Sequence, residues 1–185
     1  MNTSEEFDLL AEKCLDIFSK KAVDYGTAWR ILRTPSLTDQ IYIKAQRIRS
    51  IEQKGVALVD EGVTPEYIGI VNYSVMALIQ LEVGVANTIE ELMPAEIAIE
   101  LFKKYLGNAK ALMCNKNHDY DEAWRKMRRS SLTDIILMKL LRIKQIEDHD
   151  GNTIISEGLD ANYYDIINYA MFALIKIHEG GTSND

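Results

Sequence analysis

The sequence is poor in the residues that mark disulfide scaffolds and histidine-based metal sites. It holds only 2 cysteines and 3 histidines among 185 residues. Cys14 and Cys114 follow no spacing motif, which argues against a disulfide framework and fits a reducing, cytoplasmic location. The histidines show no paired spacing, so we expect no metal site built from histidine.

Positive charge and long apolar runs are also scarce. The formal net charge of −7 disfavours a protein that coats nucleic acid, because such a protein needs a positive field. A local cationic pocket for a nucleotide or another small phosphate ligand is still allowed. No apolar run reaches the roughly 18 residues that a membrane span needs, so we expect no membrane partner. The polar start MNTSEEFD is unlike a signal peptide.

The chain carries an internal duplication. The segment Glu61–Ile79 returns as Glu157–Ile175, and both copies place Glu-Gly before an apolar helix that contains an Asn-Tyr pair. More than half of residues 21–52 recur at the spacing that separates Asp24 from Asp119. A unit of this length exceeds the roughly 20–50 residues of a solenoid repeat. We therefore expect two copies of a small domain related by a pseudo-two-fold axis, like a homodimer made covalent. A homodimer of whole chains stays open.

Helical periodicity predicts an all-α fold of two tandem, pseudo-two-fold related four-helix units. In the first unit, we expect helices over residues 5–22, around Trp29, from Ser36 as N-cap to Gln53, and onward from Thr64 as N-cap. Ser131 repeats the cap of Ser36 in the second unit. Two short runs with a β-like pattern, at 55–60 and 151–156, could pair with each other across the axis.

The duplication also sets the expected boundaries. We place the first unit at residues 1–84, a linker at 85–94, the second unit at 95–179 and a disordered tail at 180–185. The two units are expected to pack together through their Lys/Arg helices and their Asn-Tyr helices.

One helix in each copy places cations on the same face as apolar residues. These cations are Lys44 and Arg47 in the first copy and Lys139 and Arg142 in the second. Cations that lean inward need a carboxylate or a bound anion. One interpretation is a structural ion pair with Glu61, Glu157 or Asp165. The other is a phosphate site between the two copies.

A second cluster joins acids and amides. Asp165, Asn168 and Tyr169 share one helix face, and Glu157 lies just before that helix. Two carboxylates and an amide could hold Mg²⁺, which prefers oxygen ligands. The first copy keeps Glu61, Asn72 and Tyr73, but Gly69 stands where the second copy has Asp165. A metal site would therefore belong mainly to the second copy. Alternatively, the Asn and Tyr side chains only lock helix ends by hydrogen bonds.

The third cluster is aromatic. Asp119-Tyr120 and Trp124 in the second copy repeat Asp24-Tyr25 and Trp29 of the first. A tyrosine or tryptophan close to a cation could stack on a nucleobase. For the two tryptophans, core packing is the favoured interpretation.

The order of these motifs resembles the nucleotide-modification-associated domain family. In the first copy they are Asp24-Tyr25-Gly26, Ala28-Trp29, Lys44 to Ile48, Glu61 and Asn72-Tyr73. In the second copy they are Asp119-Tyr120, Ala123-Trp124, Lys139 to Ile143, Glu157, Asp165 and Asn168-Tyr169-Ala170. The closing Glu…Asp…Asn-Tyr helix is also similar to that of the MazG-type all-α nucleoside triphosphate pyrophosphatases, which hold Mg²⁺ with paired acids.

The resemblance implies a cytosolic protein that handles nucleotides. The first hypothesis is Mg²⁺-assisted hydrolysis of a nucleoside triphosphate with release of pyrophosphate. Glu157 and Asp165 would hold the metal, while Arg142 and Lys139, with Arg47 and Lys44 across the axis, would neutralise the phosphates. Tyr120 or Tyr169 would contact the base. No ExxE pair precedes either Lys-x-x-Arg helix. The alternative is therefore a non-catalytic helical scaffold that binds a nucleotide or a protein partner.

Overall fold

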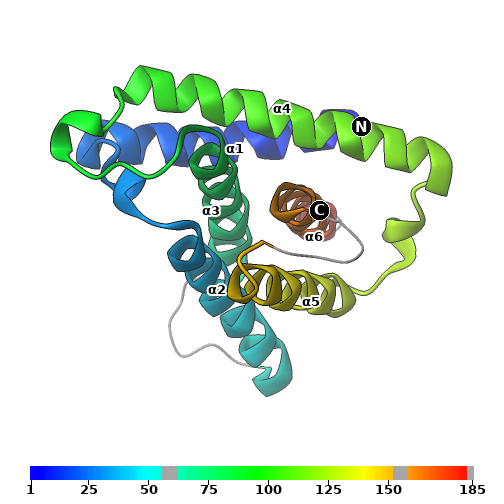
Figure 1. Ribbon diagram of the computed structural model, residues 1–185. Coiled ribbons are helices and arrows are strands. Elements are labelled where there is room, and N and C mark those ends of the chain that lie inside the picture. Colours follow the sequence, from blue (N-terminus) through cyan, green and yellow to red (C-terminus); the bar gives the residue numbers. More distant parts are fainter. Residues whose placement is uncertain (56–61, 152–157, 183–185) are drawn as a thin grey trace.

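The structure is a computed structural model that describes residues 1–55, 62–151 and 158–182 (Figure 1). Within these ranges the regular elements are all helical, as the periodicity predicted. The α-helices are α1 (Thr3–Tyr25), α2 (Thr34–Lys54), α3 (Thr64–Val83), α4 (Ala95–Tyr120), α5 (Arg129–Asp148) and α6 (Leu159–Thr182). The 3-10 helices are η1 (Ala28–Ile31), η2 (Ile89–Glu91) and η3 (Ala123–Lys126).

Both repeats have the same element order, namely an α-helix, a short 3-10 helix and two further α-helices. Each predicted four-helix unit therefore consists of three α-helices and one 3-10 turn. In the first repeat, α1 ends at Tyr25 and is capped by Gly26, whose φ of 62° favours glycine. Only a few residues separate that glycine from the start of α2. A segment this short forms a single tight turn rather than an α-helix.

The predicted start of the Lys/Arg helices at Ser36 and Ser131 is wrong. α2 begins at Thr34 and α5 begins at Arg129, so each serine lies inside its helix. Pro35 occupies the first turn of α2, where its missing N–H would have no intrahelical partner in any case. Likewise, Thr64 is the first residue of α3 rather than its cap.

The predicted linker, residues 85–94, lies between the end of α3 and the start of α4. α3 ends at Val83, α4 begins at Ala95, and the short helix η2 lies between them. α6 continues to Thr182, so residues 180–182 are helical rather than part of the tail predicted from residue 180. All but the first residue of each β-like run, and both glutamates of the Glu-Gly motifs, Glu61 and Glu157, fall in 56–61 and 152–157, outside the described residues.

The six α-helices stack in three layers of two (Figure 1). α3 and α6 lie in the middle and contact each other. α1 and α4 cover one side of this central pair, and α2 and α5 cover the other. The sequence explains this order, because α3 and α6 are apolar around most of their circumference and such helices are buried. The repeats thus meet through α2 and α5, through α3 and α6, as predicted, and also through α1 and α4.

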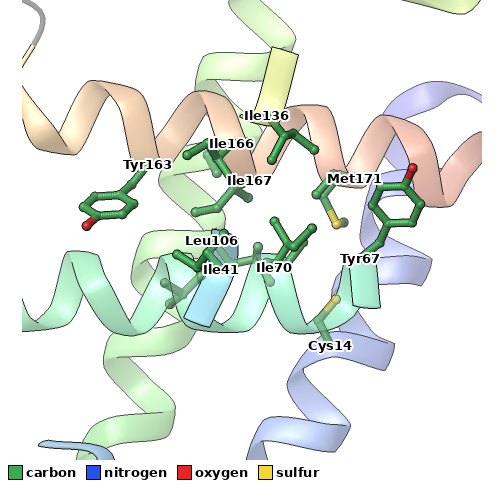
Figure 2. Close-up of a cluster of buried hydrophobic side chains, with 14 of the residues drawn as sticks. Cys14, Ile41, Tyr67, Ile70, Leu106, Ile136, Tyr163, Ile166, Ile167 and Met171 are labelled. Atoms are coloured by element: carbon green, nitrogen blue, oxygen red, sulfur yellow. The ribbon is translucent and has the colours of Figure 1, made fainter. Parts of the chain in front are cut away.

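The core of the protein lies around the central pair. Figure 2 shows Ile70 of α3 beside Ile166, Ile167 and Met171 of α6, all fully buried. Tyr67 and Tyr163, at matching positions of the two repeats, lie at opposite ends of this cluster (Figure 2). No helix among the described residues has both the length and the apolar character that crossing a membrane requires.

Polar contacts within one repeat recur at the matching positions of the other. Gln80 of α3 donates to the backbone oxygen of Arg30 at 2.8 Å, and Lys176 of α6 donates to that of Arg125 at 2.7 Å. These contacts tie the end of each central helix to the 3-10 turn of its own repeat. The turn that follows the first helix is therefore held in the same place in both copies.

Candidate functional site

A pocket of about 450 Å³ lies in the second repeat between α4, η3, α5 and α6. We call it the second-repeat pocket. Polar residues that line it are Lys116, Asn117, Tyr120, Lys139, Asp165, Asn168 and Tyr169, and apolar ones are Met113, Ala123, Trp124, Met127 and Phe172. Seven of the residues singled out from the sequence are thus in or beside one cavity: Asp119, Tyr120, Trp124, Lys139, Asp165, Asn168 and Tyr169.

The charged part of the pocket centres on Asp165. Its Oδ1 accepts a hydrogen bond from Lys116 Nζ at 2.6 Å, and its Oδ2 accepts one from Lys139 Nζ at 2.9 Å. The side chains of Lys139 and Asp165 are only 10% and 14% exposed. Because α5 turns Lys139 toward the apolar interior, its ammonium group needs this carboxylate. The predicted ion pair between Lys139 and Asp165 is therefore present.

Asn168 connects the pocket to the middle of α4. Its Nδ2 donates to the backbone oxygen of Ala109 at 3.1 Å, and Asn72 in the first repeat donates to that of Cys14 at 3.2 Å. The two asparagines therefore join the central helices to the first helix of each repeat by hydrogen bonds, as the alternative interpretation proposed, but at the middle of that first helix rather than at a helix end. The Oδ1 of Asn168 and the Nε1 of Trp124 are both buried and have no hydrogen-bond partner among the described residues.

The aromatic side chains play different parts. Phe172 stacks on Trp124 with ring centroids 4.1 Å apart, and the Arg125 guanidinium lies 4.6 Å from the centre of the Trp124 ring. Trp124 therefore has neighbours on both faces and is a packing residue, as the sequence favoured. Tyr169 meets Phe172 edge to face. Tyr120 ends α4 and is 70% exposed, so its ring is available at the mouth of the pocket.

Arg125 links the 3-10 turn η3, which forms part of the pocket wall, to α6 and α1. Its guanidinium donates to Glu122, Glu179 and Glu6 at 2.8, 2.6 and 2.8 Å, and also to Thr3. Although burial alone lowers the pKa of Arg125, the bonds to these carboxylates outweigh it and raise that pKa. Thr3 and the Arg125 side chain hold the Glu122 pKa below its usual range. The network joins η3 to α6 and to the start of α1.

The first repeat arranges the matching residues differently. Lys44 and Arg47 both contact Glu66 of α3, at 3.7 and 2.9 Å, and Lys44 Nζ also lies 5.6 Å from the centre of the Tyr73 ring. A Cβ at Gly69 would stand 2.7 Å from Cδ and Cε of Lys44. The lysine stem therefore occupies the space in which the second repeat places the Asp165 side chain.

Two functional candidates were missed from the sequence. Glu66, the partner of Lys44 and Arg47, has no acidic counterpart, because Asn162 matches it in the second repeat. Lys116 is part of the duplication, with Lys21 as its counterpart, and that identity was the available signal. By contrast, the contacts among the described residues do not bring the two Lys/Arg pairs to one common site. Lys44 and Arg47 contact Glu66, Lys139 contacts Asp165, and Arg142 is exposed.

The predicted magnesium site rests on Asp165 and Glu157. Among the described residues, Asp165 has two ammonium groups as its near neighbours, and no group of three acidic, cysteine or histidine side chains is placed to hold a metal ion. This donor set does not fit Mg²⁺, which requires oxygen ligands. Because Glu157 lies outside the described residues, its role as a ligand stays a prediction.

Comparison with known families agrees with this duplicated architecture. The family model described as nucleotide modification associated domain 1 matches residues 21–81 and again residues 116–177. Together the two matches cover more than half of the chain. The chain belongs to the nucleotide modification associated domain 1 family. The resemblance inferred from the motifs is thereby confirmed, in two tandem copies.

Each family match runs from the end of a repeat's first helix into its central helix. The second match contains every residue of the second-repeat pocket except Met113. No curated protein and no solved structure matches the chain. The similarity to MazG-type pyrophosphatases stays a prediction from the sequence.

Proposed function

We propose that this member of the nucleotide modification associated domain 1 family is a nucleotide-binding protein whose site is the second-repeat pocket. The observation that supports it best is the convergence of Lys116 and Lys139 on one anionic group, Asp165, within hydrogen-bond distance of both. Two ammonium groups that already hold one anion form a ready site for a phosphate. The family description, which links the domain to nucleotide modification, is consistent with such a ligand.

The other wall of the pocket suits a nucleobase. Tyr120 exposes its ring at the mouth, and the rings of Tyr169 and Phe172 line the interior. Stacking of a base on an aromatic ring contributes about 1–3 kcal/mol in proteins that bind single-stranded nucleic acids. A cavity of about 450 Å³ is within the roughly 300–1,000 Å³ of small-molecule sites. In the proposed complex, the base contacts the tyrosines while the phosphate lies between the lysines.

The first repeat supports the assignment by contrast. Lys44 lies over Gly69 and its ammonium group faces Glu66 and Tyr73. Phe18 replaces Met113 and Ala22 replaces Asn117, and Phe18 fills space by stacking on Phe102 at 4.4 Å. We therefore assign binding to the second repeat and a structural role to the first.

Binding is proposed here without a catalytic step. Hydrolysis of a nucleoside triphosphate, the first hypothesis from the sequence, requires a metal that the described residues around Asp165 do not fit. It stays a prediction that depends on Glu157. Release of pyrophosphate from canonical and modified deoxynucleoside triphosphates with Mg²⁺ tests it. If the unmodified chain releases pyrophosphate and the Glu157→Gln variant does not, the enzymatic hypothesis replaces the non-catalytic proposal.

The binding proposal is tested by titration calorimetry of the whole chain with the four canonical deoxynucleotides. The Lys116→Ala variant should bind at least about tenfold more weakly, since a charge-assisted hydrogen bond contributes ~1.5–3 kcal/mol. Lys21→Ala removes the matching exposed lysine of the first repeat and should leave the dissociation constant unchanged. Equal losses in the two variants, or no binding by the unmodified chain, would reject the proposal.

A further inference from the structure

We propose that the second-repeat pocket selects ligands that carry one phosphate group, so that a nucleoside monophosphate binds more tightly than the corresponding triphosphate. The inference rests on the proposed function, because it concerns the same pocket. The inference goes beyond the proposed function by stating which nucleotides the pocket prefers.

The first argument is the number of charges. Lys116 and Lys139 are the only cations among the described residues that line the pocket, and Asp165 is the only anion. A terminal phosphate monoester carries a charge of about −1.5 to −2 at neutral pH. Two ammonium groups therefore match one terminal phosphate that takes the place of the Asp165 carboxylate. Each further phosphate would bring more negative charge into the pocket, and the described residues that line it hold no third cation.

The second argument is the reach of the two lysines. A single carboxylate already bridges them, with its oxygens 2.6 Å from one Nζ and 2.9 Å from the other. One tetrahedral phosphate presents oxygens with a comparable separation and can make the same two contacts. A chain of three phosphates would have to leave this bridge and extend toward the mouth.

The third argument is the charge around the mouth. The guanidinium of Arg125, which lies over the ring of Trp124 in the pocket wall, already donates to three carboxylates and to Thr3. Asp119 and Asp121 flank Tyr120 and are exposed. The basic residues Lys126 and Arg128 are also exposed, and neither lines the pocket. Additional phosphates at the mouth would thus meet acids and a guanidinium that is already engaged.

The test compares the mono-, di- and triphosphate of one deoxynucleoside by titration calorimetry, first with EDTA and then with Mg²⁺. The free deoxynucleoside and inorganic phosphate are titrated as well, to separate the contributions of base and phosphate. We expect the monophosphate to bind most tightly, the triphosphate to bind at least about threefold more weakly, and each fragment alone to bind more weakly still. A triphosphate that binds more tightly than the monophosphate, in either buffer, would overturn the inference.

The variants make the two proposals separable. Lys116→Ala should reduce monophosphate binding more than triphosphate binding, because it removes half of the bridge on which the preference depends. Lys21→Ala should change neither. If no nucleotide binds at all, the proposed function fails. If nucleotides bind and Lys116→Ala weakens all of them while affinity rises with phosphate number, the proposed function stands and only the preference is wrong.

Discussion

The hydroxyl of Tyr67 in the first repeat lies 2.6 Å from the hydroxyl of Thr133 in the second. The matching pair, Tyr163 and Thr38, is 2.7 Å apart and joins the repeats in the opposite direction. All four residues are buried. Each threonine also contacts a glutamate, Glu52 in one network and Glu147 in the other. The two repeats are thus joined by a pair of equivalent polar networks at opposite ends of the core.

We predict that Tyr67→Phe and Tyr163→Phe each destabilise the protein by about 1 kcal/mol, because each removes one buried hydrogen bond while the threonine keeps other partners. The losses should add in the double variant, since the two networks share no residue. Urea denaturation measures this. Tyr25→Phe alters an exposed ring and serves as the control. A double variant as stable as the unmodified chain would show that these bonds do not hold the repeats together.

The glutamates of these networks predict a dependence of stability on pH. Burial raises the pKa of Glu52 and of Glu147 above the ordinary value, against the smaller opposing effects of Arg129 on Glu52 and of Thr38 on Glu147. Asp134 and Asp39, which face the two glutamates, act in the same direction as burial. The folded protein therefore holds these protons more tightly than the unfolded chain. Stability contributed by the two groups is present below their unfolded pKa of about 4.3 and is lost as the pH rises through their folded pKa.

Replacing both acids by glutamine removes this loss. The Glu52→Gln/Glu147→Gln variant should gain stability relative to the unmodified chain as the pH rises above about 4.3, and the gain should level off once both acids are ionised. The measurement is the free energy of unfolding of both proteins across the acidic range. A difference that shrinks with rising pH would contradict the sign of these pKa shifts.

Gly69→Ala tests the role of the first repeat. The new Cβ would displace the Lys44 stem, which costs part of a mostly buried ion pair with Glu66, whereas alanine favours the helix by about 1 kcal/mol. These effects oppose each other, so we expect the free energy of unfolding to change by less than about 1 kcal/mol. Nucleotide affinity should not change. Loss of binding in this variant would place the working site in the first repeat.

Asp165→Asn separates an anion site from a metal site. Because the carboxylate competes with a phosphate for Lys116 and Lys139, its removal should tighten the binding of a nucleoside monophosphate by up to about tenfold. If Asp165 held Mg²⁺, as the sequence first suggested, the same variant would bind nucleotide more weakly. Titration of both proteins with EDTA and then with Mg²⁺ gives the answer, and a thermal melt checks that Lys139 is still accommodated in the fold.

The duplication allowed most of the fold to be predicted from the sequence. The all-α class, the tandem repeat and the pairing of the central helices followed from periodicity and from the recurring Asn-Tyr motif. The start of α2 did not, because Pro35 can either end a helix or occupy its first turn. The cross-repeat role of Thr38 and Thr133 was also missed, since a threonine near a helix start is equally typical of a cap.

The candidate site was predictable only in part. The sequence indicated that the buried Asn168 needs a hydrogen-bond partner. Its acceptor is the backbone oxygen of Ala109, and because every residue has such an oxygen, the sequence does not identify it. Lys139 and Asp165 were singled out, and the structure pairs them directly. Lys116 comes from a different helix, and its approach depends on how α4 crosses α6. That crossing is a property of the packed core, which local patterns do not determine.

The central claim is that a nucleotide binds in the second repeat with its phosphate between Lys116 and Lys139. An experimental structure of the full chain with a bound deoxynucleoside monophosphate tests it most directly. We predict phosphate oxygens within hydrogen-bond distance, about 2.7–3.2 Å, of both Nζ atoms, and a base against Tyr120 or Tyr169. A nucleotide bound instead in the first repeat, for example beside Lys44 and Arg47, would contradict the account.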